Sequence, residues 1–432
     1  MIRKIGLLNH MGGGNLGDDA TQVAVAENIR ARWPDAQIVL FSMNPADTRS
    51  RHGIPSFPIR TETWHRHQEP INGTVSVKTK VKKTLRKYKP VFQFLRGVNA
   101  VAIRVPQAVY GEIKFLIRSF RIIQSFDLFI ISGGGQLLDA WGGPWKFPYT
   151  VFKWTLLAKL SRTKCYFLNV GAGPLICPLA KWFIKSALAL ADYVSFRDDD
   201  SRDLVQKIGF TGQSQVSADC VYALDSMPSG DRDATERVYP IVGISPMAYC
   251  DPRVYWQKDQ ALYDRLIHNV ASFGSWLTAN HYHVTLFSTD IWFDSQATKE
   301  VNALLRGGNA SWQSQSITLQ QIVGLDQLLS TIQTTEYVIT CRFHGVVFAH
   351  LLNKPVIALS HHPKVSSLMD DLGLSKYCLA INDCDAGILQ ETFLALVTNR
   401  DKIRASMAAK ASVYKKTLLT QFDRLFPQSA TV

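Results

Sequence analysis

Basic and titratable side chains gather in residues 339–374, which read ITCRFHGVVFAHLLNKPVIALSHHPKVSSLMDDLGL. A guanidinium fork binds a carboxylate or a phosphate through two parallel hydrogen bonds, and a lysine adds a point charge near a phosphate oxygen. An imidazole takes up and releases a proton near neutral pH. This combination predicts a site that binds a small anion and moves a proton. The side chains concerned are Arg342, His344, His361, His362 and Lys364.

These side chains fall where predicted strands give way to predicted helices. Residues 337–340 form a β-branched run, 344–352 carry helical spacing, 355–359 form a second apolar run, and Pro363 suits the first turn of a further helix. In an open parallel sheet, such junctions lie together along the carboxyl edge of the strands, where ligands bind. The pattern therefore predicts one ligand site at one sheet edge.

The first strand of the chain leads into a glycine-rich turn. Residues 4–9 form a short apolar run, followed by HMGGGNLGDDA and a helical pattern over 20–32. One interpretation is a tight turn with a helix cap. The other is an acceptor-binding loop in which Asn15 and Asp18 hydrogen-bond sugar hydroxyls while Gly17 allows close approach. The turn contains neither GxGxxG nor a Walker lysine, so it matches a phosphate loop poorly.

Two later strands also end in residues that suit a binding edge. The apolar run 126–132 ends in a second glycine turn, and a further strand over 192–196 ends at Arg197. Three aspartates follow Arg197, and they either cap the next helix or neutralise its charge. From the second glycine turn we place three residues on the acceptor side: Gly134, Gly135 and Gln136.

The length of the chain, 432 residues, predicts two domains. Residues 225–240 are polar, contain Pro and Gly and lack periodicity, which indicates a linker. Strand and helix patterns alternate on both sides of it, including a helix predicted over 319–332. The stretch 44–81 shows no regular pattern, and a tryptophan-rich loop is predicted after the second glycine turn. Each half is therefore predicted to be a doubly wound, Rossmann-type α/β domain, with a cleft between the two. The predicted domains are 1–224, with a basic insertion at about 60–125, and 241–432.

The formal net charge of +13 favours anionic partners. Residues 78–121 hold twelve Lys or Arg and one acid, Glu112. The basic amphipathic helix predicted at 109–123 either lies on an anionic membrane surface or packs on its own domain as an ordinary surface helix. No recognition motif accompanies the charge, so we do not expect nucleic acid as a partner.

Cysteine spacing and hydropathy limit the remaining classes. The seven cysteines form no CxxC pair, and the neighbours His361 and His362 point to opposite faces if they extend a strand, so we predict no metal site. No apolar run reaches the ~18 residues of a membrane span, and the N-terminus lacks the cleavage site of a signal peptide. We therefore expect a cytoplasmic protein, peripheral to the inner face of the membrane if 78–121 docks there.

Taken in order, the motifs of the chain resemble those of the polysaccharide pyruvyl transferase family. They are GGGNLGDDA, ISGGGQLLD, GAGP, SFRDDDS, SADCVYAL, GISP, and CRFHG followed by NKPVIALSHHPKVSSLMDDLGL. The resemblance spans most of the chain and implies a GT-B-like architecture. It also implies transfer of pyruvate from phosphoenolpyruvate onto two hydroxyls of a sugar as a cyclic ketal, with release of phosphate, in exopolysaccharide or cell-surface glycan biosynthesis. Phosphoenolpyruvate is then a co-substrate, and no cofactor is expected.

The resemblance carries the family's basic residues over to Arg197, Arg342, His344 and Lys364. We assign both arginines to the anionic groups of the donor, Lys364 to its phosphate, and His344 to proton transfer. The first domain then faces the acceptor. The predicted donor side includes two further residues at strand ends, Ser245 and His361.

Two rival functions remain open. A GT-B glycosyltransferase that uses a nucleotide sugar would share the two-domain form, but the acids near 339–374 include no pair of glutamates eight positions apart, as many retaining members carry. A non-catalytic glycan-binding member of the fold would keep the architecture without the chemistry. The four basic residues carried over from the family argue against it.

Overall fold

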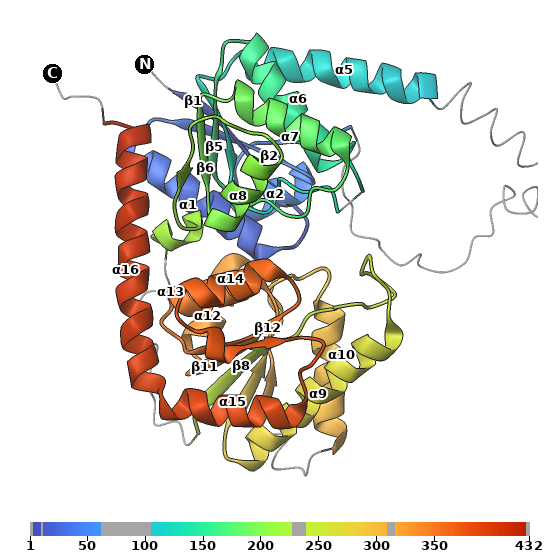
Figure 1. The fold of residues 1–432 in the computed structure, drawn as a ribbon, viewed down its shortest axis with the longest axis vertical. Helices are drawn as coiled ribbons and strands as arrows, with labels where there is room; N and C mark the ends of the chain where they lie inside the picture. The colour runs from blue at the N-terminus through green and yellow to red at the C-terminus, as the bar shows by residue number, and fades with distance from the viewer. Residues whose placement is uncertain are drawn as a thin grey trace, which may run out of the picture.

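The structure is a computed structural model that describes residues 3–9, 12–61, 105–140, 142–226, 239–308 and 316–428. Within these residues the chain forms two parallel sheets flanked by helices, one in each domain (Figure 1). The first has the strand order β3-β2-β1-β4-β5-β6-β7 and the second the order β10-β9-β8-β11-β12-β13. Both are doubly wound orders of the Rossmann type. The predicted α/β fold with two such domains is confirmed.

The first domain supplies β1 to β7 and the helices around them. Its strands are β1 (Lys4–Leu8), β2 (Gln37–Ser42), β3 (Ser56–Pro58), β4 (Leu128–Ser132), β5 (Lys164–Val170), β6 (Tyr193–Phe196) and β7 (Gln215–Val216). Its helices are α1 (Leu16–Arg32), α2 (Pro45–His52), α5 (Val105–Ile123), α6 (Phe147–Leu160), α7 (Pro178–Leu190), α8 (Asp199–Lys207) and the 3₁₀ turn η2 (Cys220–Ala223).

The second domain supplies β8 to β13. Its strands are β8 (Ile241–Ser245), β9 (His283–Leu286), β10 (Ile317–Leu319), β11 (Tyr337–Thr340), β12 (Val356–Ser360) and β13 (Cys378–Ala380). Its helices are α9 (Gln260–Ala279), α10 (Ser295–Gly308), α12 (Leu325–Gln333), α13 (Phe343–Leu351), α14 (Pro363–Asp371), η3 (Ser375–Tyr377) and α15 (Ala386–Thr398), followed by α16 (Arg400–Leu425).

The central strands are continuous buried apolar runs. β4 reads LFIIS and β11 reads YVIT, and every residue of both is buried. This pattern is typical of parallel strands that helices cover on both faces. The register is regular, with Ile339 of β11 between Ile244 of β8 and Ile357 of β12. Because the strands run parallel, the segments that follow them all emerge at one edge of each sheet.

The carboxyl edges of the two sheets meet at the domain boundary. Asn15, after β1, forms an antiparallel bridge with Asp290, after β9. Arg197, after β6, places its guanidinium carbon 4.1 Å from the ring centroid of Phe343, after β11. The fold therefore brings the strand ends of both domains to one place.

Three segments differ from the sequence prediction. The stretch 44–81, predicted to be irregular, contains α2 and β3 in its described part. The tryptophan-rich loop after β4 leads into α6, which is apolar on most sides (FPYTVFKWTLLAKL) and so lacks a polar face that would reveal a helix. The helix predicted over 319–332 is instead the end of β10 followed by α12.

The last helix of the chain contacts both domains. α16 runs along both domains and ends beside the first (Figure 1). Its Asp423 pairs with Arg32 of α1 at 2.7 Å. Its Gln421 accepts a hydrogen bond of 3.1 Å from Asn169, at the end of β5. The final helix therefore ties the two sheets together, and the bounds 1–224 and 241–432 stay a prediction.

Part of the predicted basic insertion is a helix that packs on the first domain. Of the range 60–125, residues 62–104 lie outside the described residues, and so does most of the predicted linker, 227–238. The remainder is mainly α5, which connects β3 to β4 and is anchored by an ion pair of 2.8 Å between Glu112 and Lys153 of α6. Among the described helices, none is long and apolar enough to cross a bilayer.

Candidate active site

Neighbouring strands of the second domain place the basic residues found in the sequence. β11 ends at Thr340, and Arg342 is the residue that precedes α13. β12 ends at Ser360, and His362 caps α14 by accepting a hydrogen bond of 3.2 Å from the amide of Lys364. Since β11 and β12 are paired, both junctions lie at one edge, as the sequence predicts.

The first turn of α1 lies against His344 of α13. A β-carbon on Gly17 would lie 2.0 Å from Cγ of His344, so a glycine is required for the two helices to approach this closely. Gly17 thus makes room for the imidazole of the other domain. His344 is buried, and the next residue of α1, Asp18, is buried as well.

A carboxylate that we did not predict, Asp219, connects the two domains at this point. Its Oδ1 accepts a hydrogen bond of 3.1 Å from the amide of Val221 at the start of η2. Its Oδ2 lies 3.8 Å from Nε2 of His344 and 3.7 Å from Nη1 of Arg197. Burial alone would raise the pKa of Asp219, but His344 and Arg197 together lower it below its ordinary value. Asp219 is therefore an ionised carboxylate shared between a histidine of the second domain and an arginine of the first.

Arg197 reaches the second domain from the end of β6. Its side chain is buried, its Nε lies 3.2 Å from Asp198, and its guanidinium stacks over Phe343. A β-carbon on Gly171 would lie 2.6 Å from the same Nε, so the GAGP turn leaves space for this side chain. Of the three aspartates that follow Arg197, Asp198 fills both predicted roles, because it caps α8 and contacts the arginine.

Arg342 is held by acids of its own domain. Its Nε and Nη2 bind the two oxygens of Asp294 at 2.7 and 2.8 Å, and Asp290 lies 3.7 Å away. Burial alone would lower the pKa of Arg342, but these carboxylates raise it above the ordinary value. One edge of the guanidinium is thus committed to Asp294. We expected Arg342 to direct its fork at a ligand, but less of the guanidinium is left for a ligand because Nε and Nη2 bind Asp294.

Lys364 and Asp18 influence each other across the boundary. Burial, and then the charges of Arg197 and Arg342, lower the pKa of Lys364 to about 8, although Asp18 opposes the shift. Burial raises the pKa of Asp18 to about 6, while His344, Lys364 and Arg197 act in the opposite direction. Both groups therefore titrate near neutral pH, which is typical of residues that exchange protons at active sites.

The other predicted donor residues lie beside this cluster. Nδ1 of His361 is 3.0 Å from the carbonyl oxygen of Cys341, and burial together with Lys364 and Arg342 holds the pKa of His361 well below its ordinary value. Burial and Lys364 likewise lower the pKa of His362 to about 4. Ser245 is buried at the end of β8, and its hydroxyl has no hydrogen-bond partner among the described residues.

The glycine-rich turn after β1 joins the domains. The amide of Leu16 donates to the carbonyl of Thr289 at 3.1 Å, and the amide of Ile291 donates to the carbonyl of Gly14 at 2.9 Å. The side chain of Asn15 caps α1 by accepting a hydrogen bond of 3.1 Å from Gly17. Of the two interpretations given for this turn, the helix cap is the one that the side chain of Asn15 fits.

The second glycine turn is fastened by Gln136. The side-chain amide of Gln136 is fully buried and donates to the carbonyls of Ser132 and Gly133, both at 3.1 Å. Gln136 thus stabilises the turn, which favours a structural role over contact with an acceptor. Gly134 lies beside the candidate site, because a β-carbon there would be 3.1 Å from Oδ1 of Asp18. The acceptor role of Gly134 and of Gly135 stays a prediction.

The acidic residues of the site could also have been predicted from their positions in the sequence. Asp290 and Asp294 follow β9 in the sequence FSTDIWFDS, and Asp219 follows β7 in SADC. They occupy carboxyl ends of parallel strands, as the basic residues do. Applying the same rule to acidic residues would have placed them at this edge. The described residues contain no group of three His, Cys, Asp or Glu suited to a metal ion.

The fold is shared with sugar-nucleotide enzymes at low sequence identity. The UDP-GlcNAc 2-epimerase from Neisseria meningitidis bound to UDP-GlcNAc has a TM-score of 0.56 and 8% identity, covering 99% of this chain and 100% of that chain. The UDP-GlcNAc 2-epimerase from Methanocaldococcus jannaschii has a TM-score of 0.51 and 12% identity, covering 91% and 92%. This likeness supports the GT-B-like fold and concerns the fold alone.

The family of the chain follows from its sequence. No curated protein matches it in a sequence search. Residues 15–363 match the family model described as polysaccharide pyruvyl transferase. That range runs from the cap of α1 to the start of α14 and includes Arg197, Asp219, Arg342 and His344. With most of its length matched, and with the motifs in the expected order, the chain belongs to the polysaccharide pyruvyl transferase family of transferases.

Proposed function

We propose that the protein transfers pyruvate from phosphoenolpyruvate onto two hydroxyls of a sugar as a cyclic ketal, with release of phosphate, in exopolysaccharide or cell-surface glycan biosynthesis. The observation that carries the proposal is the meeting of Arg197, His344 and Asp219 at the domain boundary, within reach of the charges of Lys364 and Asp18. Family membership supports a transferase that acts on a sugar or glycan.

The donor suits the cations of the site. Phosphoenolpyruvate carries a carboxylate and a phosphate, so it concentrates negative charge in a small volume. Burial, and then the positive charges of Arg197 and Arg342, disfavour the charged form of Lys364, as its lowered pKa shows. A bound polyanion offsets this repulsion between like charges. We assign the donor to Arg197 and Lys364, with Arg342 adding positive potential from its position beside Asp294, and with Ser245 and His361 along the wall.

The reaction needs protons to move in both directions. A proton added to the methylene carbon of the donor makes its C2 electrophilic, and a sugar hydroxyl attacks C2 and loses its proton. The bond from C2 to the phosphate oxygen then breaks, and a second hydroxyl attacks C2 and loses its proton to close the ketal ring. One proton is consumed and two are released, one of which leaves with the phosphate.

Two residues are placed to handle these protons. We assign His344 as the acid that protonates the methylene carbon, and Asp219, at 3.8 Å from Nε2, as the residue that holds its ring in position. We assign Asp18 as the base for the acceptor hydroxyls, because its pKa of about 6 leaves it mostly ionised at neutral pH. Proton transfer by a positioned side chain contributes ~10²- to 10⁴-fold in rate.

The acceptor is assigned to the first domain, beside α1 and the turn that contains Gly134. We propose that the enzyme works in the cytoplasm and needs no cofactor. Of the two interpretations of the basic stretch 78–121, we adopt contact with an anionic membrane. The structure describes the last part of this range as α5.

The test is to incubate the full chain with phosphoenolpyruvate and candidate glycans, following phosphate release and the ketal methyl signal by NMR. We expect equal amounts of phosphate and ketal. Phosphate without a ketal methyl signal would count against the proposal. Thermal stabilisation by a nucleotide sugar, but not by phosphoenolpyruvate, would favour a glycosyltransferase instead. If neither compound binds, a non-catalytic glycan-binding protein would be the better description.

A further inference from the structure

An apolar stripe on α5 faces outward from the first domain. Its side chains are 50–71% exposed, although they are large and hydrophobic. The spacing of three and four residues puts them on one side of the helix. Exposed apolar residues at this density mark a surface that contacts something else. The residues are Val109, Tyr110, Ile113 and Ile117.

The opposite side of α5 is fixed to the domain, so the exposed stripe has a defined orientation. Glu112 forms an ion pair of 2.8 Å with the buried Lys153 of α6 and accepts a hydrogen bond of 3.1 Å from Tyr149. Nζ of Lys153 also lies 4.6 Å from the ring centroid of Phe115. The inward face of the helix therefore contacts the domain, while its apolar stripe stays exposed.

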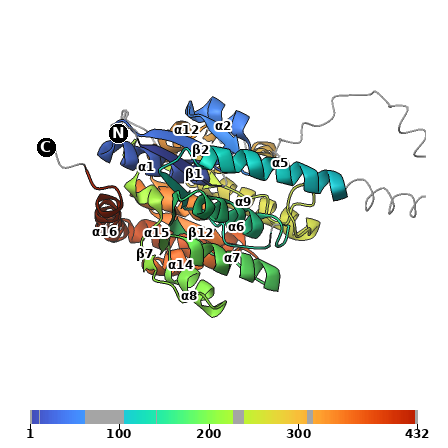
Figure 2. The same ribbon diagram turned by 90° about the horizontal axis from the view of Figure 1, so that it is seen from above.

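Two more exposed aromatic side chains lie on or beside the helices next to α5. Helices α5, α6 and α7 lie in a row in both views (Figures 1 and 2). Trp145, just before α6, and Trp182 of α7 are 63% and 51% exposed. They are connected through Phe183, whose ring centroid is 5.6 Å from that of Trp145 and 5.3 Å from that of Trp182. Two exposed indole rings thus lie in the same row of helices as the stripe on α5.

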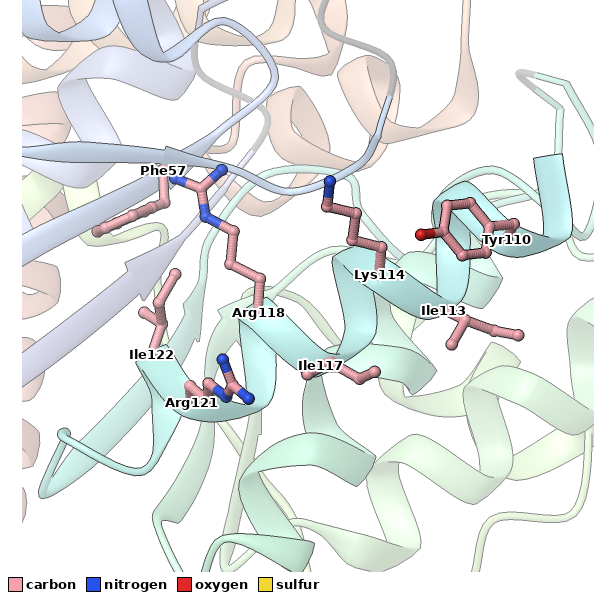
Figure 3. Close-up of a pocket in the computed structure, with 8 residues that line it drawn as sticks. All are labelled: Phe57, Tyr110, Ile113, Lys114, Ile117, Arg118, Arg121 and Ile122. Carbon is pink, nitrogen blue, oxygen red and sulfur yellow. The ribbon is translucent and has the colours of Figure 1, made fainter. Parts of the chain in front are cut away.

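Positive charges border this surface. A groove of about 670 Å³ along α5 is lined by Phe57, Ile117 and Ile122 among its apolar residues (Figure 3). Three exposed cations line the same groove. The one acid of α5, Glu112, is turned inward to Lys153. The face is therefore apolar with a basic border, and the cations are Lys114, Arg118 and Arg121.

The charge of this face distinguishes between the possible partners that could cover it. The preceding residues 78–104 contain nine Lys or Arg and no acid, so Lys114, Arg118 and Arg121 would repel them. A second copy of the chain would bring the same three cations against each other. An anionic lipid surface attracts them, accepts the apolar side chains below its headgroups, and suits Trp and Tyr at the interface.

We propose that α5, together with the exposed tryptophans Trp145 and Trp182, docks the first domain on an anionic membrane surface. Docking would bring the site to an acceptor carried by a lipid, and in this respect alone the proposal rests on the proposed function. Trp145 follows β4 and precedes α6, so it lies at the carboxyl edge of the sheet. The docked face thus extends to the sheet edge at which the candidate active site lies.

The test is co-sedimentation of the full chain with vesicles of phosphatidylcholine alone and of phosphatidylcholine with phosphatidylglycerol. We expect binding to the anionic vesicles that weakens as salt is raised. The double variant Ile113→Asp/Ile117→Asp should lose at least about tenfold in partitioning, because two charges replace inserted apolar side chains. The matched control is Val413→Asp on α16, a similarly exposed apolar side chain away from this face, which should bind like the wild type.

Several outcomes would overturn the proposal. Failure of the wild-type chain to bind anionic vesicles would do so, as would equal binding by the double variant. A dimer that the double variant abolishes would assign the face to a second copy of the chain. Because the substituted side chains are exposed, melting temperatures should match the wild type, and turnover of a water-soluble acceptor should persist. Vesicle binding without any turnover of phosphoenolpyruvate would reject the proposed function and leave the docking surface standing.

Discussion

Two arginines follow the ends of strands in the two domains, and their surroundings differ. Arg342 binds both oxygens of Asp294 at 2.7 and 2.8 Å, within its own domain. Arg197 lies 3.7 Å from Asp219 and stacks on Phe343 of the other domain. The first arginine is committed to a protein carboxylate, and the second is held more loosely at the boundary. The pairing of an arginine therefore says more about its role than its position in a motif.

The largest effect is expected from His344, the partner that shares Asp219 with Arg197. Replacing His344 with alanine should lower turnover by about 10²- to 10⁴-fold, because it removes the proposed acid. The measurement is the initial rate of phosphate release, with circular dichroism to check the fold. The control is His268→Ala on the exposed side of α9. Retained turnover in the His344 variant would remove this residue from the mechanism.

The pair of the second domain should act on stability. In Asp294→Ala the guanidinium of Arg342 and the amide of Ala248, 3.0 Å from Asp294, both lose a buried partner. We expect a loss of about 3 kcal/mol in the free energy of unfolding, measured by urea denaturation. Asp401→Ala serves as the control, because the side chain of Asp401 is 90% exposed beside Arg400 and should matter little. A variant as stable as the wild type would show that Arg342 does not need Asp294.

Conservative replacement of each arginine compares the two directly. Arg197→Lys keeps the charge and loses the fork, so the affinity for phosphoenolpyruvate should fall by about tenfold. Arg342→Lys gives up the bidentate pair with Asp294 and should lose more in unfolding free energy than in donor affinity. Calorimetric titration and urea denaturation of both variants separate the effects. A loss mainly of stability in Arg197→Lys, together with a loss mainly of donor affinity in Arg342→Lys, would contradict the roles given to the two arginines.

The smallest expected effects are shifts in the pH profile of kcat/KM. Activity should rise through about pH 6 as Asp18 ionises and fall through about pH 8 as Lys364 loses its proton. In Lys364→Arg the alkaline limb should move to higher pH, because guanidinium stays charged. In Asp18→Asn the acid limb should disappear from the residual activity. An unchanged profile in both variants would separate these two residues from the reaction.

Stability should show the titration of Asp18 independently of activity. Its folded pKa lies above its ordinary value, so the folded state binds more protons than the unfolded state between the two pKa values. The free energy of unfolding should therefore fall as pH rises from about 4 to about 6 by this contribution. Asp18→Asn should lack it, and urea denaturation across that range measures the difference. A wild-type and a variant chain with parallel pH dependence would contradict the raised pKa.

Much of the candidate site followed from local pattern. A short apolar run, then a break, then helical spacing is enough to put Arg342, His344 and Lys364 at one sheet edge, because parallel strands open on the same side. The same argument placed Arg197 at the edge of the other sheet. These are statements about neighbours in the sequence, which a single chain reveals.

The contacts across the domain boundary did not follow from local pattern. Nothing in the sequence around Gly17 shows that it must make room for His344, and the sharing of Asp219 depends on how two domains pack. The apolar character of α6 on most sides removed the periodicity that reveals a helix. Nothing in the local sequence of α16 indicated that its end lies on the first domain.

The most direct test of the proposed donor site is the calorimetric titration of phosphoenolpyruvate into the wild-type chain and into Lys364→Ala, with Lys376→Ala as the control outside the site. We expect the wild type and the control to bind alike and Lys364→Ala to bind at least about tenfold more weakly, because a charge-assisted contact with the donor is lost. Equal affinity for phosphoenolpyruvate in all three proteins, or no binding by the wild type, would contradict the proposed donor site.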